Sequence, residues 1–151
     1  MLLEFKVSNY RSIGEEQTMS LLPAPKQRDH LQNIIIKGRY QALNAISLYG
    51  PNGGCKSNIL KAMSLLDRLV HVSARTSSTT RLPYDPFLLR DGWDSKPTGF
   101  EISFIIEENR YRYGLEFTET EIKKEWLFRK SAGREVNLFE REGETIDVSS
   151  G

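Results

Sequence analysis

The sequence of 151 residues has one cysteine, two histidines and no long hydrophobic run. A single cysteine excludes an internal disulfide and is typical of a reducing compartment. No apolar stretch approaches the roughly 20 residues that a membrane-spanning helix needs. The N-terminal residues Met1–Lys6 lack the basic-then-apolar order of a signal peptide. These absences predict a soluble, cytoplasmic protein that does not enter a membrane.

An excess of one charge is also missing. The 21 Lys and Arg residues nearly balance the 20 Asp and Glu residues, which leaves a formal net charge of +1. The strongly basic balance that is typical of nucleic-acid-binding domains is therefore not present. The two histidines, His30 and His71, have no Cys or carboxylate cluster at metal-ligand spacing, which favours solvated side chains. The length suits one domain with an adequate core.

What the sequence does contain is a glycine-rich segment, Gly50–Ser57, with the letters GPNGGCKS. It matches G-x-x-x-x-G-K-[ST], the pattern of a phosphate-binding loop (P-loop), except that Cys55 stands in place of the second glycine. The apolar residues 43–49 before it predict a buried strand. The apolar residues after it recur at helical spacing and predict a helix to about Ala74. Strand, tight turn and helix together form the geometry that binds nucleotide phosphates.

Each residue type of the loop has a physical role. Small residues let the backbone approach an anion and turn its N–H groups inward, and the helix N-terminus adds unpaired amides and a positive dipole end. Lys56 would bring a charge to the outer phosphates, and the Ser57 hydroxyl would hold Mg²⁺. The alternative is an ordinary turn with a surface lysine. We predict that ATP and Mg²⁺ are bound by the loop residues Asn52, Gly53, Gly54, Cys55, Lys56, Ser57 and Asn58.

Cys55 is the departure from the pattern. A residue with a Cβ atom at this position strains the loop by about 1–3 kcal/mol or pushes the phosphate outward. That corresponds to roughly one or two decades in affinity, so we predict weakened rather than abolished nucleotide binding. A rival interpretation is that Cys55, at a helix N-terminus beside Lys56, is an acidic and oxidisable thiol that gates binding.

The rest of the chain predicts strands on both sides of this unit. Residues 1–22 contain two short strands, the first of which alternates apolar and polar side chains. Residues 43–74 form the P-loop strand and helix. Residues 75–99, rich in Ser, Thr, Pro and Arg, predict an irregular insertion. Residues 100–148 alternate over five segments without a further helix, which predicts an antiparallel β lobe.

Several stretches carry a family resemblance: FKVSNYRS at Phe5–Ser12, QTMSL at Gln17–Leu21, and Leu48–Leu60 around the P-loop. On these residues the chain resembles the ATPase heads of the RecF/SMC-like, ABC-type group. It is most similar to bacterial AAA-type ATPases of the OLD and abortive-infection kind. Residues Phe100–Phe128 resemble the antiparallel lobe of such heads. The resemblance implies an α/β P-loop NTPase fold of the ABC-ATPase-head type.

The resemblance also implies how such a protein works. Arg11, and with it Ser12, is expected near the nucleotide, the alternative being a surface arginine at a strand end. Such heads hydrolyse ATP between two copies, so a second head is the partner expected of a complete one. Family members act on DNA or in defence against phage, often with a nuclease or another effector. A nuclease or other effector and a nucleic acid are therefore the further partners implied.

Two features of a complete head are missing. One is a second strand that ends in Asp-Glu, where Asp helps to hold Mg²⁺ and Glu activates water. Glu107 is the only nearby residue that resembles this glutamate. Apolar and polar residues alternate around it, which favours an ordinary strand of the lobe. The other is a signature segment. We therefore expect residues 1–151 to be the incomplete, N-terminal half of a head, without catalytic residues of its own, which binds ATP and does not hydrolyse it alone.

Alternatives from other functional classes stay open. One is a non-enzymatic remnant or interaction module that dimerises or docks a partner through its exposed sheet edge. A kinase with the same loop fits less well, because a long antiparallel meander after the P-loop helix is not expected of a kinase. A series of arginines could also meet nucleic-acid phosphates, although interspersed aspartates favour a solvated face. This series consists of Arg68, Arg75, Arg81 and Arg90.

Overall fold

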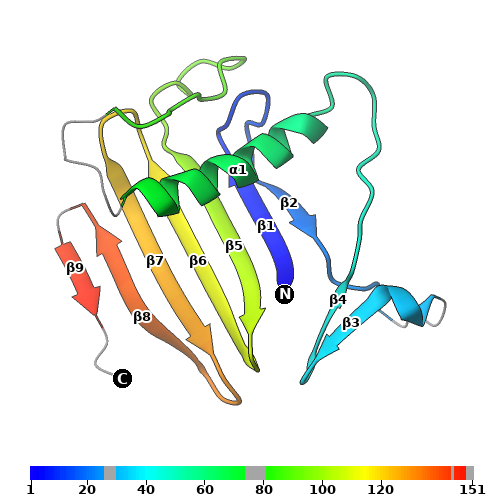
Figure 1. Ribbon diagram of the computed structural model, residues 1–151. Coiled ribbons are helices and arrows are strands. Elements are labelled where there is room, and N and C mark those ends of the chain that lie inside the picture. Colours follow the sequence, from blue (N-terminus) through cyan, green and yellow to red (C-terminus); the bar gives the residue numbers. More distant parts are fainter. Residues whose placement is uncertain (26–29, 74–80, 144, 149–151) are drawn as a thin grey trace.

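The computed structural model describes residues 1–25, 30–73, 81–143 and 145–148. They form a seven-stranded antiparallel sheet, a long α-helix and a separate two-stranded hairpin (Figure 1). The elements in chain order are β1 (Leu2–Ser8), β2 (Gln17–Ser20), a short 3-10 helix (Leu31–Asn33), β3 (Ile34–Lys37), β4 (Tyr40–Leu43), α1 (Lys56–Ser73), β5 (Thr98–Ile106), β6 (Asn109–Phe117), β7 (Ile122–Lys130), β8 (Glu135–Glu142) and β9 (Thr145–Val148).

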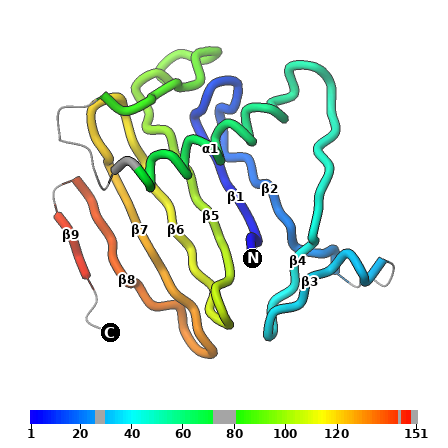
Figure 2. Tube along the Cα trace, in the orientation of Figure 1, coloured from blue at the N-terminus to red at the C-terminus, as the bar shows by residue number. Residues whose placement is uncertain are grey.

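The large sheet joins the N-terminal strands to the β lobe. Its strand order is β2-β1-β5-β6-β7-β8-β9, and each neighbouring pair is antiparallel. β1 pairs with β5, so that Lys6 lies opposite Glu101 although the two are far apart in the sequence. α1 runs across one face of this sheet (Figure 2). The fold is therefore α/β with an antiparallel sheet over the described residues.

The main core lies between α1 and the sheet face that it covers. Alternation along β1 and β5 turns Phe5, Val7 and Phe100 toward the helix, where they are 0%, 1% and 2% exposed. The helix contributes apolar residues at helical spacing. The buried members of this cluster are Phe5, Val7, Tyr10, Ile13, Met19, Ala62, Leu65, Leu66, Leu69, Phe100, Leu115 and Phe117. Their removal from water holds α1 in place over the strands.

The strand predicted at residues 43–49 is wrong. β4 ends where this segment begins, and it pairs with β3 rather than with the large sheet. Residues 45–49 make no backbone hydrogen bond within the described part of the chain. A strand exists only by pairing with a neighbour, and no described strand lies beside this segment. The apolar pattern reflects partial burial instead, because Ile46 and Leu48 pack against the core while Tyr49 is 90% exposed.

The other expected elements are present. The strands β1 and β2 occupy the predicted segments, α1 ends close to the predicted residue, and β5 to β9 follow as an antiparallel meander. The insertion predicted at 75–99 contains no helix or strand over residues 81–97, and residues 74–80 lie outside the described part. Among the described helices, none is long and apolar enough to cross a membrane.

A buried asparagine fastens the irregular segment to the sheet. Asn9 is 2% exposed and follows β1 with a left-handed φ of 47°. Its side-chain amide donates to the backbone carbonyls of Trp93, Lys96 and Pro97, and its side-chain oxygen accepts from the Phe87 N–H at 2.9 Å. Because both polar atoms of this buried side chain are paired, the turn after β1 is held in one position. That turn carries Ser12.

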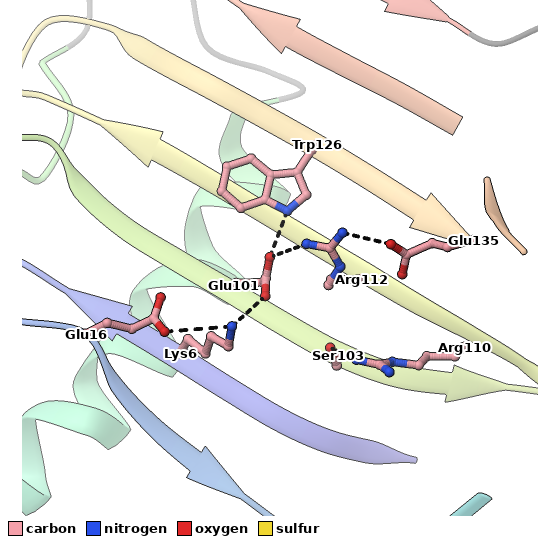
Figure 3. A network of polar contacts seen from close by, with 8 residues as sticks. All are labelled: Lys6, Glu16, Glu101, Ser103, Arg110, Arg112, Trp126 and Glu135. Carbon is pink, nitrogen blue, oxygen red and sulfur yellow. Dashed lines mark hydrogen bonds and ion pairs between the residues drawn. The ribbon is translucent and has the colours of Figure 1, made fainter. Parts of the chain in front are cut away.

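The sheet face opposite to α1 carries a polar network (Figure 3). Glu101 alternates with the core residues of β5, so its carboxylate lies on this other face. It accepts from Arg112 at 2.9 Å and from the indole N–H of Trp126 at 3.0 Å, and it pairs with Lys6 at 3.3 Å. Arg112 also donates to Glu135 at 2.9 Å. The network links β1, β5, β6, β7 and β8 across the sheet.

Candidate functional site

The candidate site is the loop that precedes α1. It borders a cavity of about 320 Å³, and Ser12 from the turn after β1 joins the loop residues in its lining. The described lining residues are Ser12, Asn52, Gly53, Gly54, Cys55, Lys56, Ser57 and Asn58. All seven loop residues predicted from the sequence thus border one cavity. The lining offers backbone, hydroxyl, amide, thiol and ammonium groups, and no carboxylate among the described residues.

The loop backbone is left-handed at two successive bends. Gly53 has a φ of 82° and Cys55 a φ of 60°. Glycine adopts such angles readily, whereas a residue with a Cβ atom is strained there by about 1–2 kcal/mol. The glycine of the motif therefore belongs at position 55 for a conformational reason, and the strain expected of Cys55 is present in the structure.

The loop amides divide into two groups. The N–H of Gly54 donates to the Pro51 carbonyl at 3.0 Å, and the N–H of Cys55 donates to the Gly53 carbonyl at 2.9 Å. The N–H groups of Gly53, Lys56 and Ser57 make no hydrogen bond within the described part of the chain. Such groups at the start of a helix are those that bind an anion. The amides of Gly54 and Cys55 are therefore engaged inside the loop, whereas those of Gly53, Lys56 and Ser57 are available to a ligand.

The Lys56 ammonium lies against the loop rather than extending from it. Its Nζ atom donates to the carbonyl of Gly50 at 2.8 Å and to that of Pro51 at 2.7 Å. This position keeps the positive charge beside the cavity. An incoming phosphate must compete with these two carbonyls for the ammonium protons, which lowers the net gain of binding.

A hydrogen-bonded cluster ties the loop to the turn after β1. The Ser12 hydroxyl donates to Cys55 Sγ at 3.1 Å and accepts from Asn58 Nδ2 at 2.6 Å. The Cys55 thiol in turn donates to the Ser12 carbonyl at 3.3 Å. These hydrogen bonds join the three side chains, which therefore hold one another in place. The cysteine side chain is thereby anchored on the side of Ser12.

Arg11 does not border the loop cavity. Its Nε atom pairs with Asp85 at 2.7 Å, and its guanidinium lies 5.4 Å from the centre of the Tyr10 ring. It lines a neighbouring cavity along α1 instead. The role near the nucleotide expected for Arg11 stays a prediction. The residue of this turn that the structure brings to the loop is Ser12, and the only sequence signal for it is the resemblance of Phe5–Ser12.

The lining fits a chain of phosphates better than it fits a metal alone. It consists of hydrogen-bond donors and one cation, the groups that bind phosphate oxygens. Ser57 is exposed at the start of α1, where its hydroxyl can join phosphate oxygens and water around Mg²⁺. Among the described residues no group of three or more His, Cys, Asp or Glu side chains is placed to hold a metal ion. A bound Mg²⁺ would supply charge neutralisation of the phosphates there.

Glu107, the residue that resembles the catalytic glutamate of a complete head, lies away from the loop cavity. Glu107 occupies the turn between β5 and β6 and borders a third cavity together with Arg39 and Ala132. It is absent from the described lining of the loop cavity. The described residues therefore place no carboxylate where it could activate a water molecule against a phosphate bound at the loop.

A protein-family model matches residues 46–149, which is more than half of the chain. The description of that family is "AAA domain, putative AbiEii toxin, Type IV TA system". No curated protein matches the chain. The matched range contains the loop, α1 and all strands from β5 to β9. AAA P-loop domains generally bind ATP with Mg²⁺. By the extent of this match, the chain belongs to this family of AAA domains.

Proposed function

We propose that the chain is the ATP-binding, N-terminal part of an ABC-type AAA ATPase and that it binds ATP with Mg²⁺ at the cavity of the P-loop. The observation that carries the proposal is the lining of that cavity, which holds donors and one ammonium group at a helix N-terminus and no described carboxylate. A polyanion gains most from such a lining. Membership of the AAA-domain family supports ATP as the polyanion.

The residues divide the work of binding. The N–H groups of Gly53, Lys56 and Ser57 bind phosphate oxygens, and the Lys56 ammonium neutralises the outer phosphates. The Ser57 hydroxyl completes the shell of Mg²⁺. The role near the nucleotide that the resemblance implies for Arg11 is not part of this proposal, because its side chain pairs with Asp85 and lies outside the described lining of the loop cavity.

Binding is weak because the loop must rearrange to accept the ligand. Lys56 has to leave two carbonyls, and the amides of Gly54 and Cys55 have to turn out of the loop. The bonds between Cys55 and Ser12 resist that rearrangement. Only the two bonds between Cys55 and Ser12 would be missing from a loop with glycine. At about 1 kcal/mol for each bond, they lower the affinity by roughly one or two decades relative to such a loop.

Hydrolysis by this chain alone is not expected. The reaction needs a carboxylate that activates water, and the described cavity lining contains none. We expect no release of phosphate from Mg-ATP above that of buffer. Turnover that disappears in Lys56→Ala would contradict this part of the proposal.

The biological setting follows from the family description. Its words name a toxin of a type IV toxin–antitoxin system, which supports a role in abortive infection or another defence against phage. A second head, a nuclease or another effector is the proposed partner of a complete protein, and DNA transactions are the proposed context. These partners rest on the resemblance of the P-loop and the Asn9–Ser12 turn.

A second candidate function is a non-enzymatic interaction module. The observation that favours it is β9, an outermost strand of the sheet in which every residue is exposed, including Ile146 at 60% and Val148 at 69%. An exposed, short edge strand can pair with a strand of another molecule. In that case the P-loop would be a remnant without a ligand.

Thermal unfolding with and without nucleotide separates the two functions. A site saturated with Mg-ATP stabilises the folded chain by a few kcal/mol, and a site without affinity adds nothing. We expect a higher melting temperature with Mg-ATP, loss of the rise in Lys56→Ala, and an unchanged rise in Lys37→Ala, which removes an exposed lysine of β3. Equal melting temperatures with and without saturating Mg-ATP would favour the interaction module.

A further inference from the structure

A second cavity follows α1 beyond the P-loop. Its volume is about 540 Å³, and its described lining consists of Tyr10, Arg11, Leu60, Lys61, Ser64, Leu65 and Arg68. Three of these side chains are cations, and none is an acid. Arg11 precedes Ser12 of the loop cavity, so neighbouring residues of one turn border the two cavities.

Only one of the three cations has an acidic partner among the described residues. Arg11 pairs with Asp85 through Nε, whereas the side chains of Lys61 and Arg68 make no ion pair or hydrogen bond within the described part of the chain. Asp67, the acid adjacent to Arg68, pairs with His71 at 3.4 Å. Two positive charges therefore stay uncompensated around one concave site, which raises the local concentration of anions.

The side chains on the strand side of this cavity are held in place. The backbone N–H of Arg11 donates to the Asp85 carbonyl at 2.8 Å, which fixes the turn, and its guanidinium lies over the Tyr10 ring. Burial raises the pKa of the Tyr10 hydroxyl, and the positive charges of Arg11 and Arg68 oppose that rise. Both cations thus act on the same side chain. A positioned cation loses little freedom when it binds an anion.

The spacing of the cations favours more than one phosphate group. Lys61 and Arg68 are seven residues apart on α1, about 10 Å along the helix axis. A single phosphate is smaller than this separation, whereas phosphates in series can meet both cations. Leu60, 57% exposed, adds an apolar contact at the cavity.

We propose that this cavity is a second anion site, distinct from the P-loop, and that Arg11, Lys61 and Arg68 bind successive phosphate groups of one ligand there. The shared chemistry is a chain of phosphates, supplied either by a nucleic-acid strand or by a small linear polyphosphate. The site goes beyond the proposed ATP site, because its cations lie outside the described lining of the loop cavity.

The test uses Lys56→Ala as background, so that the P-loop does not contribute. Two probes are titrated separately: a short fluorescent oligothymidine by anisotropy and inorganic tripolyphosphate by calorimetry. The site variant carries Lys61→Ala and Arg68→Ala, and the control carries Lys123→Ala and Lys124→Ala, which removes the same charge from β7. Circular dichroism and melting temperature confirm that all variants fold.

We expect the site variant to lose about tenfold in affinity for at least one probe, and the control to change little. If the oligothymidine is the ligand, the slope of log K against log salt also falls by about 1.4, or 0.7 for each phosphate contact removed. Loss confined to tripolyphosphate identifies a small polyphosphate as the source. Equal affinities of the site variant and the control for both probes would overturn the proposal.

The outcome is independent of the proposed ATP site. In a chain that retains Lys56, the site variant should keep the melting-temperature rise given by Mg-ATP. If Mg-ATP fails to stabilise any variant while the phosphate probes still depend on Lys61 and Arg68, the ATP proposal fails and the second site stands. If the site variant abolishes the Mg-ATP response as well, the two cavities form one site and the proposal of a distinct site is wrong.

Discussion

At the scale of single residues, Cys55, which replaces the glycine of the motif, affects both the stability of the P-loop and its binding of nucleotide. Cys55 has a left-handed φ of 60° and is tied to Ser12 by hydrogen bonds in both directions. The strain is already present without a ligand, so it lowers folding stability. The anchor to Ser12 acts on binding, because it resists movement of the loop. The two effects of one cysteine are therefore separable by substitution.

Restoring the motif glycine should strengthen nucleotide binding. Cys55→Gly relieves the left-handed strain and removes the bonds to Ser12, so we expect about tenfold tighter Mg-ATP binding by calorimetry. Cys55→Ala is the matched control, because it removes the thiol and keeps the Cβ atom. A gain shared by both variants assigns the effect to the anchor, and a gain confined to glycine assigns it to the Cβ atom. Affinities of Cys55→Gly and the natural chain that agree within error would refute the explanation.

Ser12 can be tested as the residue that positions the loop. Ser12→Ala removes the bonds to Cys55 Sγ and Asn58 Nδ2, and we expect a loss of about 1–2 kcal/mol in the free energy of unfolding. Ser47→Ala, an exposed serine before the loop, is the control and should change little. Urea unfolding measures both. A Ser12→Ala variant as stable as Ser47→Ala would show that the cluster does not contribute.

At the scale of elements, the sheet depends on one close approach between β6 and β7. A Cβ atom on Gly114 would lie 2.2 Å from Cζ2 of Trp126, whose indole N–H donates to Glu101 on the same face. Only glycine leaves room for the ring on this face. Through its bond to Glu101, the ring belongs to the polar network that spans five strands. The alternating pattern of residues 100–148 predicted the strands, but it carried no signal for this contact.

We expect Gly114→Ala to destabilise the sheet strongly. The added methyl group has to displace Trp126 and break its bond to Glu101, at a cost of about 1–3 kcal/mol in the free energy of unfolding. Gly133→Ala, with no atom within 4 Å of the added Cβ and no left-handed φ, is the matched control and should be nearly neutral. Denaturant unfolding that gives equal midpoints for the two variants would show that the ring moves aside freely.

The ion pair between β6 and β8 predicts a pH dependence. The hydrogen bond from Arg112 holds the pKa of the Glu135 carboxyl below its ordinary value. A carboxyl with a lowered folded pKa contributes stability above its unfolded pKa of about 4.3, and the contribution is lost as the pH falls through the folded pKa. Glu135→Gln should therefore lower the unfolding free energy near neutral pH, with a difference that vanishes in acid.

The control for this pH dependence is Glu107→Gln. Glu107 is exposed and has no ion pair among the described residues, so its substitution should leave the curve of stability against pH almost unchanged. A Glu135→Gln penalty that persists undiminished in acid would mean that the carboxyl acts through packing rather than through its charge.

At the scale of the whole molecule, local patterns predicted the elements, and long-range pairing decided where they lie. Alternation gave the strands of residues 100–148, and helical spacing gave α1. The prediction of a strand before the P-loop was wrong, because a strand forms only beside a neighbouring strand. The residues of the segment itself do not encode that neighbour. The same holds for the cavity at the loop: its seven loop residues belong to one local motif, whereas the contact of Ser12 with Cys55 and the pairing of Arg11 with Asp85 join distant parts of the chain.

The central claim is that the loop before α1 receives nucleotide phosphates on its backbone. The most direct measurement is an amide NMR spectrum of the ¹⁵N-labelled chain during titration with Mg-ATP, with Lys56→Ala alongside. We predict that the largest shift changes fall on the N–H groups of Gly53, Lys56 and Ser57, and that they are lost or much reduced in the variant. Shift changes at saturation that leave residues 52–58 unmoved, or that are identical in Lys56→Ala, would contradict the claim.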